Sequence, residues 1–332
     1  MANATPRRRG GVWMVLAVAL LLTGACQRPH PAGAGAGAVL RVASQRGGTR
    51  AIMEASGVLA GAPYKVEWSE FAAASPLLEA LGANAVDVGG VGDAPFVFAY
   101  AAGAPIKAVL AYNSGARGSS TAVVTSGASS IHNVADLRGK RIATVKGSIG
   151  HFLLLRLLER AGIAPKDVQV VFLDPGASRG ALQSGSIDAW ATWSPYIGLA
   201  TLHDGARIVA DGQGVLDGVG FFAASDQAIA GKGPLISDFL ARLARAQAWA
   251  SSHADAYGAV LAKDTGLPPD VARDAAVRLA GHVEPLDDAV KEKEHATLET
   301  FRQAGVIDTT PNIDGAFAPQ LSQAALSPPP PG

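Results

Sequence analysis

The sequence predicts an α/β protein of two domains, one inserted within the other, from three observations. Short β-rich runs alternate with helical patterns, which is typical of α/β units around largely parallel sheets. Two polar stretches of small residues, Asn113–Ser120 and Asp211–Gly214, lie next to predicted strands. The segment between them has a complete α/β pattern of its own. We therefore expect the chain to cross between the domains twice, at Ser114–Ser120 and at Asp211–Gly220.

Nine strands are expected where β-branched and apolar residues form short runs between turn residues. They are Val39–Ala43, Tyr64–Trp68, Val86–Gly89, Ile106–Tyr112, Thr121–Thr125, Arg141–Val145, Val168–Leu173, Ala189–Thr192 and Gly220–Ala224.

Two helices have clear start signals. Ser75-Pro76 places a serine at the N-cap and a proline at the first helical position, so a helix is expected through Leu81. A second helix is expected from about Ile149 to Ala161, with Gly162 just past its end. From Pro234 to Phe301 the pattern is helical, with no strand expected.

The N-terminus has the features of a secretory signal peptide, which we assign to residues 1–25. Three consecutive arginines, Arg7–Arg9, precede an apolar run from Val12 to Leu22 and then small residues. This run is too short to span a bilayer, which takes about 20 residues. The alternative is an N-terminal transmembrane anchor.

Cys26 is the only cysteine of the chain, so it has no partner for an internal disulfide. The sequence Leu22–Cys26 resembles a bacterial lipobox, in which the cysteine is lipidated and becomes the first mature residue, although Thr23 stands where leucine is commoner. The alternative is ordinary cleavage that leaves a free cysteine. Residues 26–38, rich in glycine and alanine, then form a flexible tether between the anchor and the folded body.

Charge and composition exclude several function classes. Removal of residues 1–25 leaves 25 basic and 28 acidic residues, a formal net charge of −3, which provides no basic surface for nucleic acid or membrane. A hydrophobic content of 48% is ample for two packed domains. We expect residues 39–116 and 218–318 to form one lobe, 117–217 the other, and 319–332 a disordered proline-rich tail.

A set of motifs in fixed order resembles the aliphatic sulfonate-binding proteins of ABC importers, within the nitrate/sulfonate/bicarbonate/taurine group. The motifs are Trp68–Phe71, Leu77–Leu81, Gly92–Pro95, Val134–Lys140, Lys146–Ser148 and Asp188–Trp190. The resemblance covers Val39–Ser225 closely and the helical C-terminal region loosely. It implies a bilobed periplasmic-binding-protein fold (type II-like), two α/β domains joined by two crossing segments, with the ligand held between them. It also implies an ABC permease and its ATPase as partners of a protein that we expect to be monomeric and free of cofactors.

Three strand-to-helix junctions predict an anion site: Ala43–Gly48, Gly92–Pro95 and Lys146–Ser148. Ligands of open α/β sheets bind beyond the carboxyl ends of strands, where the following helices present backbone N–H groups without intrahelical acceptors. Such helix N-termini bind anions, and glycine allows close approach. A sulfonate only accepts hydrogen bonds, so this composition suits it.

Eleven ligand-binding residues are expected at these junctions and in the neighbouring segments: Gln45, Gly92, Asp93, Ala94, Ser119, Gly147, Ser148, His151, Trp190, Trp193 and Phe222. The three aromatic residues would form an apolar wall for the organic part of the ligand, and core packing is their alternative role. For the polar residues the alternatives are a helix cap, a solvated loop or a linker. Asp93 fits an N-cap better than a ligand contact, because its carboxylate would repel an anion.

Catalysis is not expected. The sequence has no Gly-x-Ser-x-Gly elbow at a strand-to-helix turn, and none of its seven histidines has the spacing of a zinc pair. Enzymes of this fold that resemble porphobilinogen deaminase require a cysteine that carries the cofactor, whereas Cys26 is at the export site. A sensory or adhesive lipoprotein without a transporter remains an alternative that neighbouring genes would resolve.

Within binding proteins, an alkanesulfonate is the expected ligand of this exported protein, in the periplasm or at the cell surface. Taurine, nitrate, bicarbonate, sulfate esters and thiamine precursors are the alternatives. Nitrate and bicarbonate are small and flat, and would leave a tryptophan-lined pocket half empty. Taurine needs a cleft carboxylate for its ammonium group, and Asp93 is the one strong candidate.

Overall fold

The computed structural model describes residues 37–46, 48–114 and 118–327. The predicted signal peptide, Cys26, most of the tether and the last five residues of the tail lie outside these ranges. Within the described ranges, no helix combines the length and the apolar character needed to cross a membrane.

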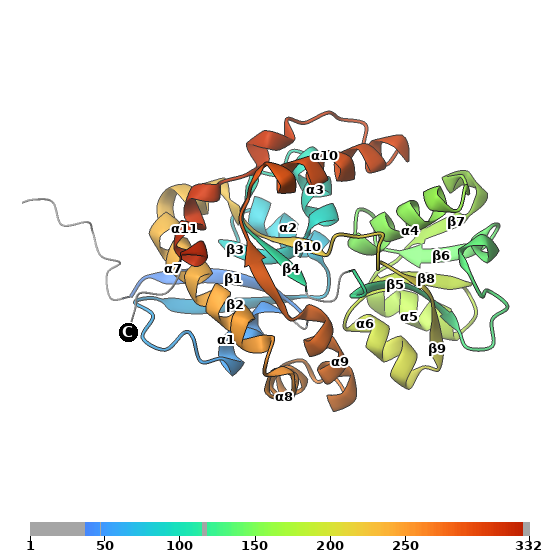
Figure 1. Cartoon of the computed structure of the whole chain (residues 1–332), viewed down its shortest axis with the longest axis horizontal. Helices are drawn as coiled ribbons and strands as arrows, with labels where there is room; N and C mark the ends of the chain where they lie inside the picture. The colour runs from blue at the N-terminus through green and yellow to red at the C-terminus, as the bar shows by residue number, and fades with distance from the viewer. Residues whose placement is uncertain (1–36, 47, 115–117, 328–332) are drawn as a thin grey trace, which may run out of the picture. The chain divides into compact units, whose positions relative to one another are not determined.

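Six strands form the first sheet, in the order β11-β4-β10-β3-β1-β2 (Figure 1). Strand β1 is parallel to both β2 and β3, whereas β10 is antiparallel to β3 and β4, and β11 is antiparallel to β4. The strands are β1 (Val39–Gln45), β2 (Lys65–Phe71), β3 (Val88–Gly92), β4 (Ile106–Ser114), β10 (Val219–Ser225) and β11 (Gly281–Glu284).

Five strands form the second sheet, in the order β7-β6-β8-β5-β9. Strand β6 is parallel to β7 and β8, and β5 is antiparallel to β8 and β9. The strands are β5 (Thr121–Ser126), β6 (Arg141–Thr144), β7 (Gln169–Phe172), β8 (Ala189–Trp193) and β9 (Ala206–Asp211). Each sheet is covered by its own helices (Figure 1).

The helices carry the labels of Figure 1. They are α1 (Thr49–Ala55), α2 (Ala74–Gly82), α3 (Asp93–Ala101), α4 (Ile149–Arg160), α5 (Pro175–Gln183), α6 (Tyr196–Gly198), α7 (Asp226–Ala250), α8 (Ala254–Thr265), α9 (Pro269–Leu279), α10 (Asp288–Gln303) and α11 (Gln323–Leu326). A π-helical turn, Leu199–His203, follows α6.

Strands β9 and β11 were not expected. Strand β9 is an edge strand with Arg207 as its second residue, and it lacks the clean alternation of buried and exposed residues that marks a strand in a sequence. Strand β11 has only four residues between two helices, and it forms by pairing with the edge of β4. The expectation that residues 234–301 contain no strand is therefore wrong.

Helix starts were predicted with mixed success. Helix α4 begins at Ile149 after the N-cap Ser148, as expected. Helix α2 instead has Ala73 as its N-cap, because Ser75-Pro76 fits inside the first turn, where a missing N–H costs no intrahelical bond. The N-cap of α3 is Gly92 and not Asp93, which is the first helical residue.

The chain crosses between the two sheets twice, once from β4 to β5 and once from β9 to β10. The two crossings lie against each other: the N–H of Gly212 donates to the carbonyl oxygen of Thr121 at 3.0 Å. A Cβ atom on Gly212 would lie 2.5 Å from the carbonyl oxygen of Gly118, so the crossings pack more closely there than other residues would allow.

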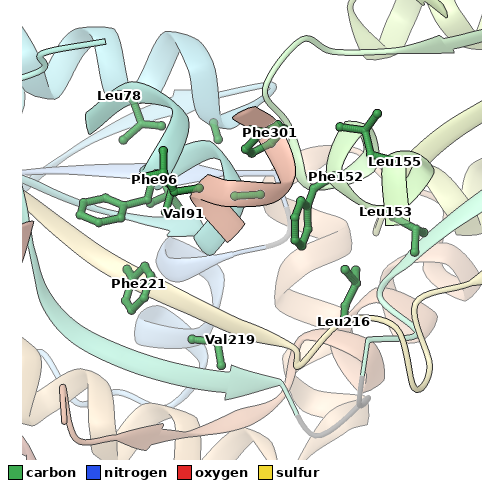
Figure 2. Close-up of a cluster of buried hydrophobic side chains, with 14 of the residues drawn as sticks. Leu78, Val91, Phe96, Phe152, Leu153, Leu155, Leu216, Val219, Phe221 and Phe301 are labelled. Atoms are coloured by element: carbon green, nitrogen blue, oxygen red, sulfur yellow. The ribbon is translucent and has the colours of Figure 1, made fainter. Parts of the chain in front are cut away.

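Apolar packing continues from one lobe to the other (Figure 2). Phe96 of α3 packs against Phe221 of β10 with ring centroids 5.2 Å apart. Phe301 of α10 packs against Phe152 of α4, which covers the second sheet, at 5.5 Å. Burial of each of these side chains contributes about 1.5–3 kcal/mol. The contact between Phe152 and Phe301 therefore contributes substantially to the packing of one lobe against the other.

Candidate functional site

Helices from both lobes begin at one cavity of about 160 Å³. The N-caps of α2, α3 and α4, which are Ala73, Gly92 and Ser148, all line it, as does Gly48, the N-cap of the seven-residue α1 in the predicted Ala43–Gly48 junction. Since one water needs only about 10–15 Å³ on the same measure, the cavity has room for a small organic molecule.

The sequence brings these helix starts together because each helix follows the carboxyl end of a strand. Helices α2 and α3 follow β2 and β3 of the first sheet, and α4 follows β6 of the second. Neither Ala73 nor Gly92 caps its helix with a side chain, and among the described residues at the start of α3 only the N–H of Ala94 is taken by a side chain, that of Asp93. The dipoles of all three helices favour negative charge at this point.

Ser148 is both a helix cap and part of the cavity wall. It is buried, and its Oγ accepts a hydrogen bond from the N–H of His151 at 3.1 Å. The same oxygen lies 3.4 Å from Oγ1 of Thr144. The Ser148 hydroxyl proton can therefore be donated either to Thr144 or to a ligand.

Two buried polar side chains of the lining have unused hydrogen-bonding atoms. Oγ of Ser194, in the turn after β8, and Oε1 of Gln247, in α7, have no hydrogen-bond partner among the described residues. A buried polar atom without a partner is costly, and a ligand can supply one. Neither residue was predicted from the sequence. The predicted residue Gln45 also lines the cavity, and its Nε2 donates a hydrogen bond of 2.9 Å to the carbonyl oxygen of Gly90.

Among the described residues of the lining, Asp93 is the one acidic residue and Arg46 is the one basic residue. The Asp93 carboxyl is buried, and its Oδ1 accepts a hydrogen bond from the N–H of Ala94 at 2.7 Å. Burial raises the pKa of Asp93 to about 7. A protonated, neutral Asp93 is far less repulsive to an anion than a carboxylate.

Aromatic side chains from both lobes form the apolar part of the wall. Phe222 of β10 and Tyr112 of β4 pack with ring centroids 5.8 Å apart, and Trp193 of β8 comes from the other lobe. Gly90 allows this arrangement, because a Cβ there would lie 3.1 Å from the Phe222 ring. Tyr257 of α8 completes the wall.

Six of the eleven predicted residues line the cavity: Gln45, Gly92, Asp93, Ser148, Trp193 and Phe222. The other five lie outside its lining. Ala94 is fully buried within α3, and Trp190 is buried beside Tyr196 with ring centroids 6.0 Å apart. The backbone oxygen of Ser119 accepts a hydrogen bond from Arg278 at 2.7 Å.

Gly147 and His151 lie where the lobes meet. A Cβ on Gly147 would overlap the ring of Phe98, so glycine is required for α3 to approach this turn. Nδ1 of His151 accepts a hydrogen bond from the N–H of Gly147 at 3.2 Å. Burial lowers the pKa of His151 to about 4, so the imidazole is neutral at pH 7, as an acceptor must be.

No group of three or more His, Cys, Asp or Glu side chains in the described part of the chain has an arrangement that could hold a metal ion. The lining is instead rich in hydrogen-bond donors from backbone and hydroxyl groups. A cavity between two α/β lobes, lined by helix starts from both, defines a ligand-binding protein.

Comparison with known proteins supports this class. The alkanesulfonate-binding protein SsuA from Xanthomonas axonopodis pv. citri, solved bound to MOPS, superposes with a TM-score of 0.78 at 33% identity, over 85% of this chain and 98% of that one. The expected bilobed periplasmic-binding-protein fold is therefore confirmed. The chain belongs to the NMT1/THI5-like family, whose model matches residues 64–256.

Other relatives fall into the same class or share only the fold. A protein of Escherichia coli (strain K12) named "Putative aliphatic sulfonates-binding protein" is 34% identical over 266 residues, 79% of this chain and 83% of that protein. The taurine-binding periplasmic protein of the same organism is 32% identical over 150 residues, 45% of each chain. The desulfurization enzyme DszB has 18% identity and a TM-score of 0.63, over 87% of this chain and 99% of that one, which shows the fold alone.

Proposed function

We propose that this protein is exported, captures a small organic anion, an alkanesulfonate, between its lobes and delivers it to the permease of an ABC importer. The observation that carries the proposal is the convergence of the α2, α3 and α4 N-termini on one cavity. The names of the relatives, which refer to sulfonates, support the same ligand class.

The available donors are sufficient for tight binding. A hydrogen bond to a charged group contributes about 1.5–3 kcal/mol, so three or four contribute about 5–12 kcal/mol before ordering costs. Micromolar affinity corresponds to about 8 kcal/mol. A buried arginine is therefore not needed, and Arg46, the one basic residue among the described residues of the lining, is exposed.

The aromatic wall favours an organic anion. Trp193, Tyr112 and Phe222 offer apolar surface that nitrate or bicarbonate would leave uncovered, whereas an alkyl chain would cover it. Taurine, sulfate esters and thiamine precursors remain the competing ligands.

Binding, not catalysis, is the activity we propose. The enzyme DszB shares the fold, so the fold alone does not decide between binding and catalysis. The sole cysteine of this chain is Cys26, at the predicted lipid anchor, so the folded body has no cysteine nucleophile. With a lipid on Cys26, the protein would remain at the outer face of a membrane, beside the permease it serves. A sensory lipoprotein would bind the same ligand, and a permease and an ATPase encoded next to this gene would favour transport.

A thermal-shift panel on the mature protein without its lipid tests the ligand class. Alkanesulfonates at millimolar concentration should raise the melting temperature, because a ligand that binds only the native state stabilises it by mass action. Sugars, neutral amino acids and simple cations should not. A rise with a neutral solute and none with any sulfonate contradicts the proposal.

A further inference from the structure

A second cavity, of about 320 Å³, lies between α4 and α10, next to the second crossing. It shares Asp93, Leu216 and Val219 with the cavity described above. These three residues therefore border both cavities, and a ligand that extends from one cavity into the other would pass beside them.

The second cavity has an excess of acidic groups. Of the five carboxyl side chains that the described residues contribute to it, Glu159 is paired with Arg156 at 2.5 Å and Glu299 with Arg302 at 2.8 Å. The remaining three are Asp93, Asp217 and Glu294, and they face one further basic residue of the lining, Lys293.

Glu294 is the least satisfied of these groups. Its side chain is fully buried, and neither carboxyl oxygen has a hydrogen-bond partner among the described residues. Lys293 therefore does not reach it. Burial, followed by the nearby Asp93 and Asp217, raises the pKa of Glu294 well above its ordinary value. A buried carboxyl that lines a cavity without any partner indicates that a donor is missing from the cavity.

We propose that the second cavity is a subsite for an organic ammonium group, carried by a zwitterionic sulfonate whose anionic end lies at the three helix N-termini. This inference rests on the proposed function and adds ω-aminoalkanesulfonates to the proposed substrates. Glu294 and Asp93 are the acceptors of the ammonium group.

The chemistry of the lining matches such a group. An ammonium group has three donors, which suit the two free oxygens of Glu294 and the Asp93 oxygen that does not bind Ala94. No group of three or more His, Cys, Asp or Glu side chains among the described residues is arranged to hold a metal ion, so we assign an organic ammonium group, and not a metal ion, to this cavity. Leu216, Val219 and Phe152 would pack along the carbon chain that joins the two ends of the ligand. Because the ammonium group must pass Leu216 and Val219, chains of three or four carbons test the site better than taurine.

The experiment compares Glu294→Gln with the wild type at pH 8 by calorimetry. Each protein is titrated with 3-aminopropanesulfonate and 4-aminobutanesulfonate, and with the alkanesulfonates of the same chain lengths. Glu294→Gln keeps the shape of the side chain and removes its charge. We expect its affinity for the aminosulfonates to fall about tenfold or more, and its affinity for the alkanesulfonates to change less than about twofold. The control is Glu292→Gln, which alters an exposed acid on the same helix outside the lining of both cavities and should change neither.

Lys293→Gln provides an independent variant, because removal of this competing cation should strengthen aminosulfonate binding alone. Equal loss of affinity for both ligand series in Glu294→Gln, or no loss for either, overturns the subsite. If no sulfonate of either series binds the wild type, the proposed function fails first. These outcomes are distinguishable because the alkanesulfonates bind only in the first cavity.

Discussion

The phenol hydroxyl of Tyr196 donates a hydrogen bond of 2.8 Å to the carbonyl oxygen of Ala72. Tyr196 belongs to α6, which follows β8 of the second sheet, and Ala72 precedes α2 on the first sheet. The bond therefore joins the two lobes, and it does so beside the cavity, since Ala73 and Trp193 are part of the lining. A ligand held between the lobes and this hydrogen bond stabilise the same arrangement of the two lobes.

Tyr196→Phe should consequently weaken ligand binding without preventing it. A hydrogen bond of this kind contributes about 0.5–1.5 kcal/mol, so we expect the affinity for an alkanesulfonate to fall about 2- to 12-fold, mainly through faster dissociation. Stopped-flow measurement of the dissociation rate checks this.

Tyr64→Phe is the matched control. The Tyr64 hydroxyl donates to Asp238 at 2.8 Å within the first lobe, so its loss should lower the melting temperature and leave the dissociation rate unchanged. Equal dissociation rates in Tyr196→Phe and the wild type would show that the bond between the lobes has no part in holding the ligand.

Asp93 should make both stability and affinity depend on pH. Because burial raises its folded-state pKa to about 7, its stabilising contribution is complete below about pH 4, the unfolded pKa, and is lost as the pH rises through 7. Asp93→Asn should therefore be more stable than the wild type at pH 8, by on the order of 2–4 kcal/mol, and this advantage should shrink as the pH falls toward 4. Thermal denaturation across this range measures it.

The affinity for alkanesulfonates should follow the same titration. In the wild type it should decrease between pH 6 and pH 8, as Asp93 becomes negative beside the anion. In Asp93→Asn it should stay constant over this range. An identical pH profile in the two proteins would show that Asp93 does not face the ligand.

Ser194 and Ser148 should respond differently to removal of their hydroxyl groups. Ser194→Ala deletes a buried oxygen without a partner, so the free protein should be no less stable, whereas ligand affinity should fall about 2- to 12-fold. Ser148→Ala also removes a helix cap, which costs about 0.5–2 kcal/mol of stability. Chemical denaturation and calorimetry of both variants separate the two effects. Unchanged affinity in Ser194→Ala would exclude it from the site.

The junctions at the starts of α3 and α4 were predictable because their signals are local, whereas the start of α2 was not among the predicted anion junctions. Glycine, serine and proline at a strand end, as in Gly92–Pro95 and Lys146–Ser148, identify a helix start wherever the rest of the chain lies. The two crossings were predictable for the same reason, since polar stretches of small residues stand out between apolar strands.

The remaining part of the site depends on tertiary packing. Gln247 lies in the last turn of α7 and Tyr112 near the end of β4, and neither position carries a sequence signal that distinguishes a cavity wall from the core. Trp190 and Trp193 illustrate this ambiguity, because one is buried in the core and the other lines the cavity. Strand β11 exists only because β4 offers it an edge.

Cys26 should carry a lipid in the mature protein. If the lipobox resemblance is functional, intact-mass measurement of the native protein will show a chain that begins at Cys26 with a diacylglyceryl modification. Cys26→Ser should release the protein from the membrane fraction or leave it uncleaved. An unmodified N-terminus in the wild type contradicts the anchor.

Capture of an anion by helix N-termini is the central claim, and a matched pair of ligands tests it most directly. Calorimetric titration of the mature protein with an alkanesulfonate is compared with titration by the methyl sulfone of the same alkyl chain, which has a similar shape and no charge. We expect roughly micromolar binding of the sulfonate and an affinity at least about a hundredfold lower for the sulfone. Equal affinities for the two ligands would show that the cavity recognises shape and apolar surface, and that the helix N-termini do not select for charge.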